Sequence, residues 1–80
     1  MKTIAIDDFL SNGILIEKKF REAIDKINWL QYENDNILIK GCSEVVIPTW
    51  AYLIITSKLV PHAKNIYYGD SRSAIKIYRK

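Results

Sequence analysis

The fold is decided by residues 37–69, which read ILIKGCSEVVIPTWAYLIITSKLVPHAKNIYYG. Ile37 to Gly41 is predicted to form a mostly buried strand, and residues 65–69 are predicted to form a second strand. Between them, Pro48 suits the first turn of a helix that runs to about Val60, because the N–H that proline lacks has no helical partner there. The order and lengths of these segments predict a βαβ unit with a right-handed crossover and two parallel strands.

Parallel strands also predict where a functional site would lie. The loops that leave the carboxyl ends of neighbouring parallel strands meet at one edge of the sheet, where ligands commonly bind. We therefore expect a ligand or partner site built from two such loops and from the start of the helix. The candidate residues are Gly41, Cys42, Ser43, Glu44, Thr49, Asp70, Ser71 and Arg72.

The flanking segments extend this unit. Residues 3–6 are predicted to be extended, and Asp7 and Asp8 can begin a brief helix. From Glu17 onward, apolar residues recur every three or four positions, at Phe20, Ala23, Ile24 and Ile27, which predicts an amphipathic helix. A turn over residues 70–73 precedes a strand over residues 74–78. The predicted fold class is α/β: a small mixed sheet built on one right-handed βαβ unit, with an N-terminal amphipathic helix and a C-terminal strand, in a single domain over residues 1–80.

Length and composition limit the class of protein. A chain of 80 residues has room for one domain, and its small core makes oligomerisation an expectation. The net charge of +3 is mild, which makes it weak evidence for a nucleic-acid partner. The apolar runs at residues 45–47 and 50–55 are shorter than the roughly 20 residues of a membrane span. No signal-peptide pattern opens the chain, so we expect a cytoplasmic protein without membrane contact.

Cys42, the single cysteine, is one candidate for chemistry. It follows a predicted strand and precedes a predicted helix N-terminus, whose partial positive charge would lower the pKa of a nearby thiol. The alternative interpretation is a small buried hydrophobic residue. Gly41 to Ser43 also faintly resembles an anion-binding loop, but the known phosphate-loop patterns need more glycines and a lysine at fixed spacing.

The remaining polar and aromatic residues do not predict catalysis or metal binding. His62, the single histidine, follows Pro61 at the predicted end of a helix and is expected to cap it. One histidine and one cysteine are too few for a tetrahedral metal site, and no catalytic triad or spaced carboxylate pair stands out. We therefore expect no metal or cofactor and favour a non-enzymatic role. Aromatic residues that could stack on bases are interpreted mainly as core residues; they are Trp50, Tyr52, Tyr67 and Tyr68.

The chain resembles an uncharacterised bacterial domain-of-unknown-function family over about residues 5–80. The resemblance is carried by residues 41–70, GCSEVVIPTWAYLIITSKLVPHAKNIYYGD, by residues 6–22, IDDFLSNGILIEKKFRE, and by Trp29 and Tyr32. It implies longer members with two related copies of this unit, encoded near iron–sulfur cluster assembly genes. In those members a second cysteine follows the glycine and the acidic residue that match Gly69 and Asp70. This chain has Arg72 near that place, so the resemblance does not imply two-cysteine chemistry here. The matching motif is Gly41, Cys42, Ser43, Pro48, Trp50, Ala51, Tyr52, Gly69 and Asp70.

Three function hypotheses follow. The leading one is a small binding or adaptor protein that acts as a homo-oligomer and binds an unidentified protein partner. Its basis is the single copy of a unit that the longer members of the resembled family carry twice. The small core and the helix over residues 50–59 also predict an oligomer, because a helix that is apolar on nearly every side needs a second layer or a partner chain to cover it. The candidate oligomer interface is Trp50, Tyr52 and Leu53. The second hypothesis is a thiol-based accessory protein in iron–sulfur cluster assembly that uses Cys42. The third is an RNA- or ribosome-associated protein, whose candidate basic residues are Lys58, Lys64, Lys76, Arg79 and Lys80.

Overall fold

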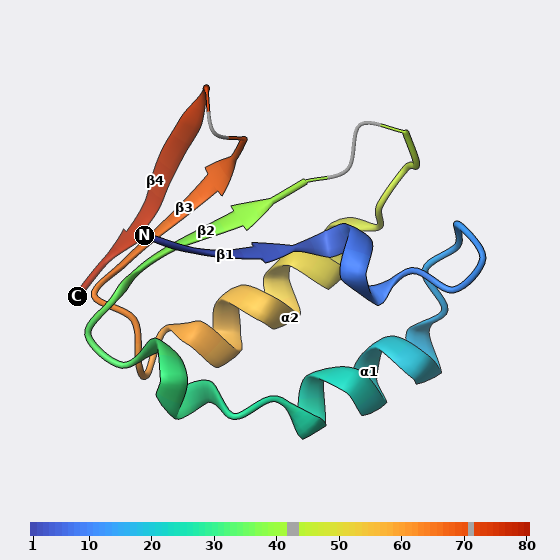
Figure 1. Cartoon of the computed structure of the whole chain (residues 1–80), viewed down its shortest axis with the longest axis horizontal. Helices are drawn as coiled ribbons and strands as arrows, with labels where there is room; N and C mark the ends of the chain where they lie inside the picture. The colour runs from blue at the N-terminus through green and yellow to red at the C-terminus, as the bar shows by residue number, and fades with distance from the viewer. Residues whose placement is uncertain (42–43, 71) are drawn as a thin grey trace.

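The computed structural model describes residues 1–41, 44–70 and 72–80 of the chain. In the described part, four strands form one sheet in the order β1-β2-β3-β4 (Figure 1). The first three strands are parallel, and β4 pairs antiparallel with β3. The elements in chain order are β1 (Lys2–Ala5), the 3₁₀ helix η1 (Ile6–Phe9), α1 (Glu17–Lys26), the 3₁₀ helix η2 (Trp29–Tyr32), β2 (Asn36–Lys40), α2 (Thr49–Leu59), β3 (Asn65–Gly69) and β4 (Ala74–Arg79).

The described sheet contains two βαβ units where the sequence predicted one. The predicted unit is confirmed as β2, α2 and the parallel strand β3. A second unit precedes it, because β1 pairs in parallel with β2 and places Thr3 opposite Leu38. The described structure starts with β1, where residues 3–6 were predicted to be extended. The predicted amphipathic helix is α1, but it lies in the connection between β1 and β2, so its N-terminal position is not confirmed. Four residues of β1 carry too short a pattern to reveal that they join the sheet.

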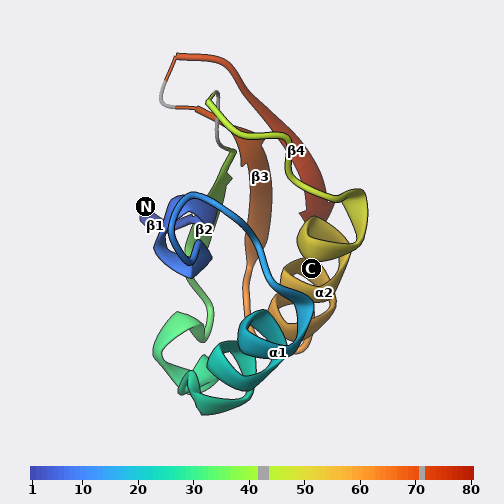
Figure 2. The ribbon, with the colours of Figure 1, turned by 90° about the vertical axis from the view of Figure 1, so that its right-hand side faces the viewer.

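Both long helices lie on the same face of the sheet (Figures 1 and 2). Two crossovers of the same hand produce this arrangement when each new strand is added on the same side of the previous one. The core fills the space between the helices and the sheet. Its largest contributions come from the sheet (Ile4, Ile37, Ile39, Ile66), from α1 (Phe20, Ile24) and from α2 (Ala51, Ile55, Leu59), all of which are buried.

Helix α2 has different surroundings on its two long sides. One side packs against α1, where the rings of Trp50 and Phe20 meet edge to face at 5.8 Å between centroids. On the other side Leu53 is 63% exposed, although the helix is mostly apolar and its apolar residues are not confined to one face. The fold therefore covers α2 with the sheet and α1 but leaves one long side open.

Candidate functional site

The carboxyl ends of β2 and β3 lie next to each other. The Gly41 N–H donates a hydrogen bond to the Gly69 carbonyl at 3.3 Å. A Cβ atom on Gly41 would lie 3.3 Å from the Tyr52 hydroxyl oxygen and 3.4 Å from the Tyr68 hydroxyl oxygen. Two tyrosine hydroxyls therefore approach the backbone at the end of β2. The remaining candidates at this edge, Cys42, Ser43 and Ser71, lie outside the described residues.

Asp70 stabilises the turn that follows β3. Its Oδ1 accepts hydrogen bonds from the backbone N–H groups of Arg72 and Ser73, both at 2.8 Å. These two bonds, and to a lesser degree the charge of Lys40, hold the pKa of the exposed Asp70 carboxyl below its ordinary value. A carboxylate that accepts from its own turn in this way has a structural role in the β3–β4 hairpin.

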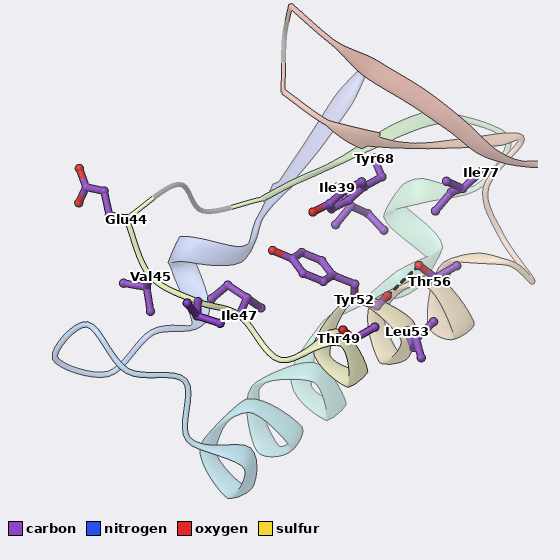
Figure 3. Close-up of a pocket in the computed structure, with 11 residues that line it drawn as sticks. Ile39, Glu44, Val45, Ile47, Thr49, Tyr52, Leu53, Thr56, Tyr68 and Ile77 are labelled. Carbon is purple, nitrogen blue, oxygen red and sulfur yellow. Dashed lines mark hydrogen bonds between the residues drawn. The ribbon is translucent and has the colours of Figure 1, made fainter.

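A groove of about 670 Å³ runs along the side of α2 that α1 does not cover (Figure 3). This volume falls within the roughly 300 to 1,000 Å³ of typical ligand pockets. The α2 side chains that line it are spaced three and four residues apart and form one stripe. The lining residues come from α2 (Thr49, Tyr52, Leu53, Thr56), from the sheet (Ile39, Tyr68, Ile77) and from the segment before α2 (Glu44, Val45, Val46, Ile47).

The surface of the groove is mostly apolar. Val46 is 94% exposed and Ile77 is 47% exposed, and the Tyr52 and Tyr68 rings meet edge to face at 5.0 Å. The Thr56 hydroxyl donates to the Tyr52 carbonyl at 2.8 Å, a bond within the helix. Glu44 is the one charged residue among the lining residues that the structure describes. The groove is therefore suited to binding an apolar surface rather than to acid–base chemistry.

The structure divides the predicted ligand site between two places. Glu44 and Thr49 line the groove. Asp70 and Arg72 lie in the turn between β3 and β4, and both are exposed. The predicted edge residues that are described thus belong partly to an apolar groove and partly to a hairpin turn.

The predicted oligomer interface is also divided. Tyr52 and Leu53 line the groove, but Trp50 lies on the other side of α2 and packs against Phe20 of α1. The contribution of the sheet to the groove, above all of Tyr68 and Ile77, was not predicted from the sequence. A signal for it was present in β4, because two isoleucines separated by one lysine place apolar side chains on one face of a strand.

His62 lies just past the end of α2, but its ring is not shown to cap the helix. Its backbone N–H donates to the Leu59 carbonyl at 2.9 Å, whereas its ring Nδ1 lies 2.8 Å from a carboxylate oxygen of Glu33. Within residues 1–41, 44–70 and 72–80, no three side chains of histidine, cysteine, aspartate or glutamate gather as metal ligands would. None of the described helices has the length and apolar character to cross a membrane.

Comparison with known proteins gives a family but no activity. No curated protein and no solved structure matches the chain. One family model, described as a protein of unknown function (DUF2480), matches residues 1–80. Because that match extends over all 80 residues, the chain belongs to this family of proteins of unknown function.

Proposed function

We propose that the chain is a cytoplasmic, non-enzymatic binding or adaptor domain that works as a homodimer, and that two copies associate through the groove beside α2. The observation that carries this proposal is the exposed apolar surface of the groove, to which α2, a mostly apolar helix without a single polar face, contributes Tyr52 and Leu53. A mostly apolar helix is normally covered on most of its sides, whereas the side of α2 that carries Leu53 is exposed in the described part of the chain.

Exposed apolar side chains at the groove contribute to the area that a dimer interface needs. Val46, Leu53 and Ile77 line the groove and are each between 47% and 94% exposed. A standard interface buries about 800 Å² per partner, of which about 65% is apolar in homodimers.

Shape and charge also favour a second copy. Leu53 protrudes at the rim of the groove, so a two-fold contact can place this side chain of each copy in the groove of the other. The chain carries a net charge of +3, but the described lining contains no lysine or arginine. Like-charge repulsion between two copies is therefore weak at this surface.

Light scattering with the variant Leu53→Glu tests the proposal. The wild-type chain is expected to form a dimer at micromolar concentration, and Leu53→Glu is expected to be a monomer of 9.3 kDa, because it buries an unpaired carboxylate in the interface. Leu30→Glu is the matched control: Leu30 is 66% exposed but lies in η2, away from the groove, so this variant should remain dimeric. A monomeric wild-type chain, or equal dissociation of the two variants, would refute the proposal.

A further inference from the structure

The face of the sheet opposite α1 and α2 has a different character from the groove. Side chains alternate between the two faces of a strand, and Ile37, Ile39 and Ile66 point toward the helices. Their neighbours along the strands point the other way. The strand register aligns one row of these side chains across the whole sheet: Thr3, Leu38, Tyr67 and Lys76.

This opposite face, which we call the open face, is basic. The four described strands contain no aspartate or glutamate, and their charged residues are Lys2, Lys40, Lys76 and Arg79. Lys2 lies 3.6 Å from Asp35 and is partly neutralised, and Lys40 is near enough to the exposed Asp70 carboxylate to lower its pKa. The register places the other three on the open face, since Lys40 is opposite Gly69, Lys76 opposite Tyr67, and Arg79 opposite Asn65.

An aromatic ring lies within this basic face. Tyr67 is half-buried in β3, and the Lys76 ammonium lies 5.6 Å from the centroid of its ring. Lys40 is two strands and two residues away from Lys76, which is about 10 Å across the sheet and about 7 Å along it. An aromatic ring with one cation beside it and two more on the same face of the sheet provides both contacts of a single-stranded nucleic-acid site, a stacking surface for a base and cations for the backbone.

We propose that the open face binds single-stranded RNA, with a base stacked on Tyr67 and phosphates bound by Lys40, Lys76 and Arg79. Single strands fit better than duplexes because their bases are unstacked and accessible to an aromatic ring on a sheet. This site differs from the basic set predicted from sequence. Lys76 and Arg79 remain, Lys40 joins them, Lys58 lies on α2 in the other layer, and Lys80 is 4.0 Å from Glu33.

Fluorescence anisotropy with a labelled single-stranded uridine oligonucleotide tests the site. A plot of the logarithm of the binding constant against the logarithm of the salt concentration should have a slope of about −2. The reason is that each of the three proposed phosphate contacts to a single strand contributes about −0.7 to this slope. Tyr67→Ala should weaken binding by about tenfold or more, whereas Tyr67→Phe keeps the ring and should bind like the wild type. A salt-independent affinity, or an unchanged affinity of Tyr67→Ala, overturns the proposal.

Two double variants separate the position of the charges from their number. Lys40→Gln with Lys76→Gln should bring the salt slope to about −0.7, because only one phosphate contact remains. Lys18→Gln with Lys58→Gln removes the same net charge from the helical layer and should leave the slope near −2. Equal weakening by the two pairs would show that overall charge alone attracts the RNA, and tighter binding of duplex RNA than of the single strand would equally overturn the site. The groove is on the other side of the sheet, so the outcome is independent of the dimer test.

Discussion

Replacing Gly69 with alanine should destabilise the fold through the β3–β4 hairpin. Gly69 ends β3 with a φ of +140°, a conformation that residues with a Cβ rarely adopt. The new Cβ would lie 2.1 Å from the Ser73 carbonyl oxygen and 3.1 Å from the Ala74 Cα. Both obstacles are backbone atoms, so no side-chain rotation relieves the contact. The hairpin must open or shift at its first residue pair.

The expected cost follows from two separable effects. The backbone conformation alone costs about 1 to 3 kcal/mol for a residue other than glycine. Opening the turn also weakens the hydrogen bond from the Asp70 N–H to the Ser73 carbonyl, which is 3.3 Å long in the wild-type chain. A bond of this kind contributes about 1 kcal/mol. We expect a loss of about 3 kcal/mol or more, a large share of the roughly 4 to 12 kcal/mol typical of a domain of this size.

Urea denaturation followed by far-ultraviolet circular dichroism measures this loss. Gly13→Ala is the control, because Gly13 also has a positive φ, +76°, but a Cβ there would have no atom within 4 Å. It should cost only about 1 to 2 kcal/mol, the conformational part. If Gly69→Ala loses no more free energy of unfolding than Gly13→Ala, the steric argument is wrong.

The other predictions concern the core, the turn and the thiol. Ile55→Ala removes a fully buried side chain of α2 and should lower the free energy of unfolding by about 2 to 5 kcal/mol in the same urea assay; a loss below 1 kcal/mol would contradict the packing. The pKa of Asp70 is lowered in the folded chain, so its contribution to stability is present above its unfolded pKa of 3.8 and is lost as the pH falls through the lower folded value. Asp70→Asn keeps an acceptor for the turn but should remove this acid-dependent part, which thermal melting between pH 2 and 5 detects as a flatter curve; a curve parallel to the wild type would count against it. Cys42 lies outside the described residues, and its reactivity remains a prediction: a functional thiol reacts with a thiol reagent in the native protein, whereas reaction only after denaturation would end the iron–sulfur hypothesis.

The positions of most elements could be predicted because their patterns are local. The three- and four-residue spacing after Glu17 marks α1, and Pro48 marks the start of α2, which begins one residue later at Thr49. The parallel pairing of β2 and β3 also followed, since one helix of this length between two strands leaves few alternatives. The pairing of β1 did not follow, because its partner begins more than thirty residues later and four residues carry little information.

The groove shows a different limit. A mostly apolar helix without a single polar face indicates that α2 needs cover on several sides, but the pattern does not reveal which side α1 takes. The structure decides this through the contact of Phe20 with Trp50, so Leu53 and Tyr52 are left to line the groove. The contribution of Ile77 depends on strand order, which was not predictable from a single sequence.

The parallel pairing of β1 with β2 has a consequence for the chain during its synthesis. Lys2 is aligned with Ile37, so β1 leaves the ribosome thirty-five residues before the partner that completes its hydrogen bonds. At about 5 to 20 residues per second, this interval is about 2 to 7 seconds. During that time Ile4 and Ile6, both buried in the finished fold, are exposed on an unpaired segment. The β3–β4 hairpin, in contrast, is closed by a short turn and can form as soon as both strands have emerged. Among the described strands, β1 is therefore the one that depends longest on protection from aggregation.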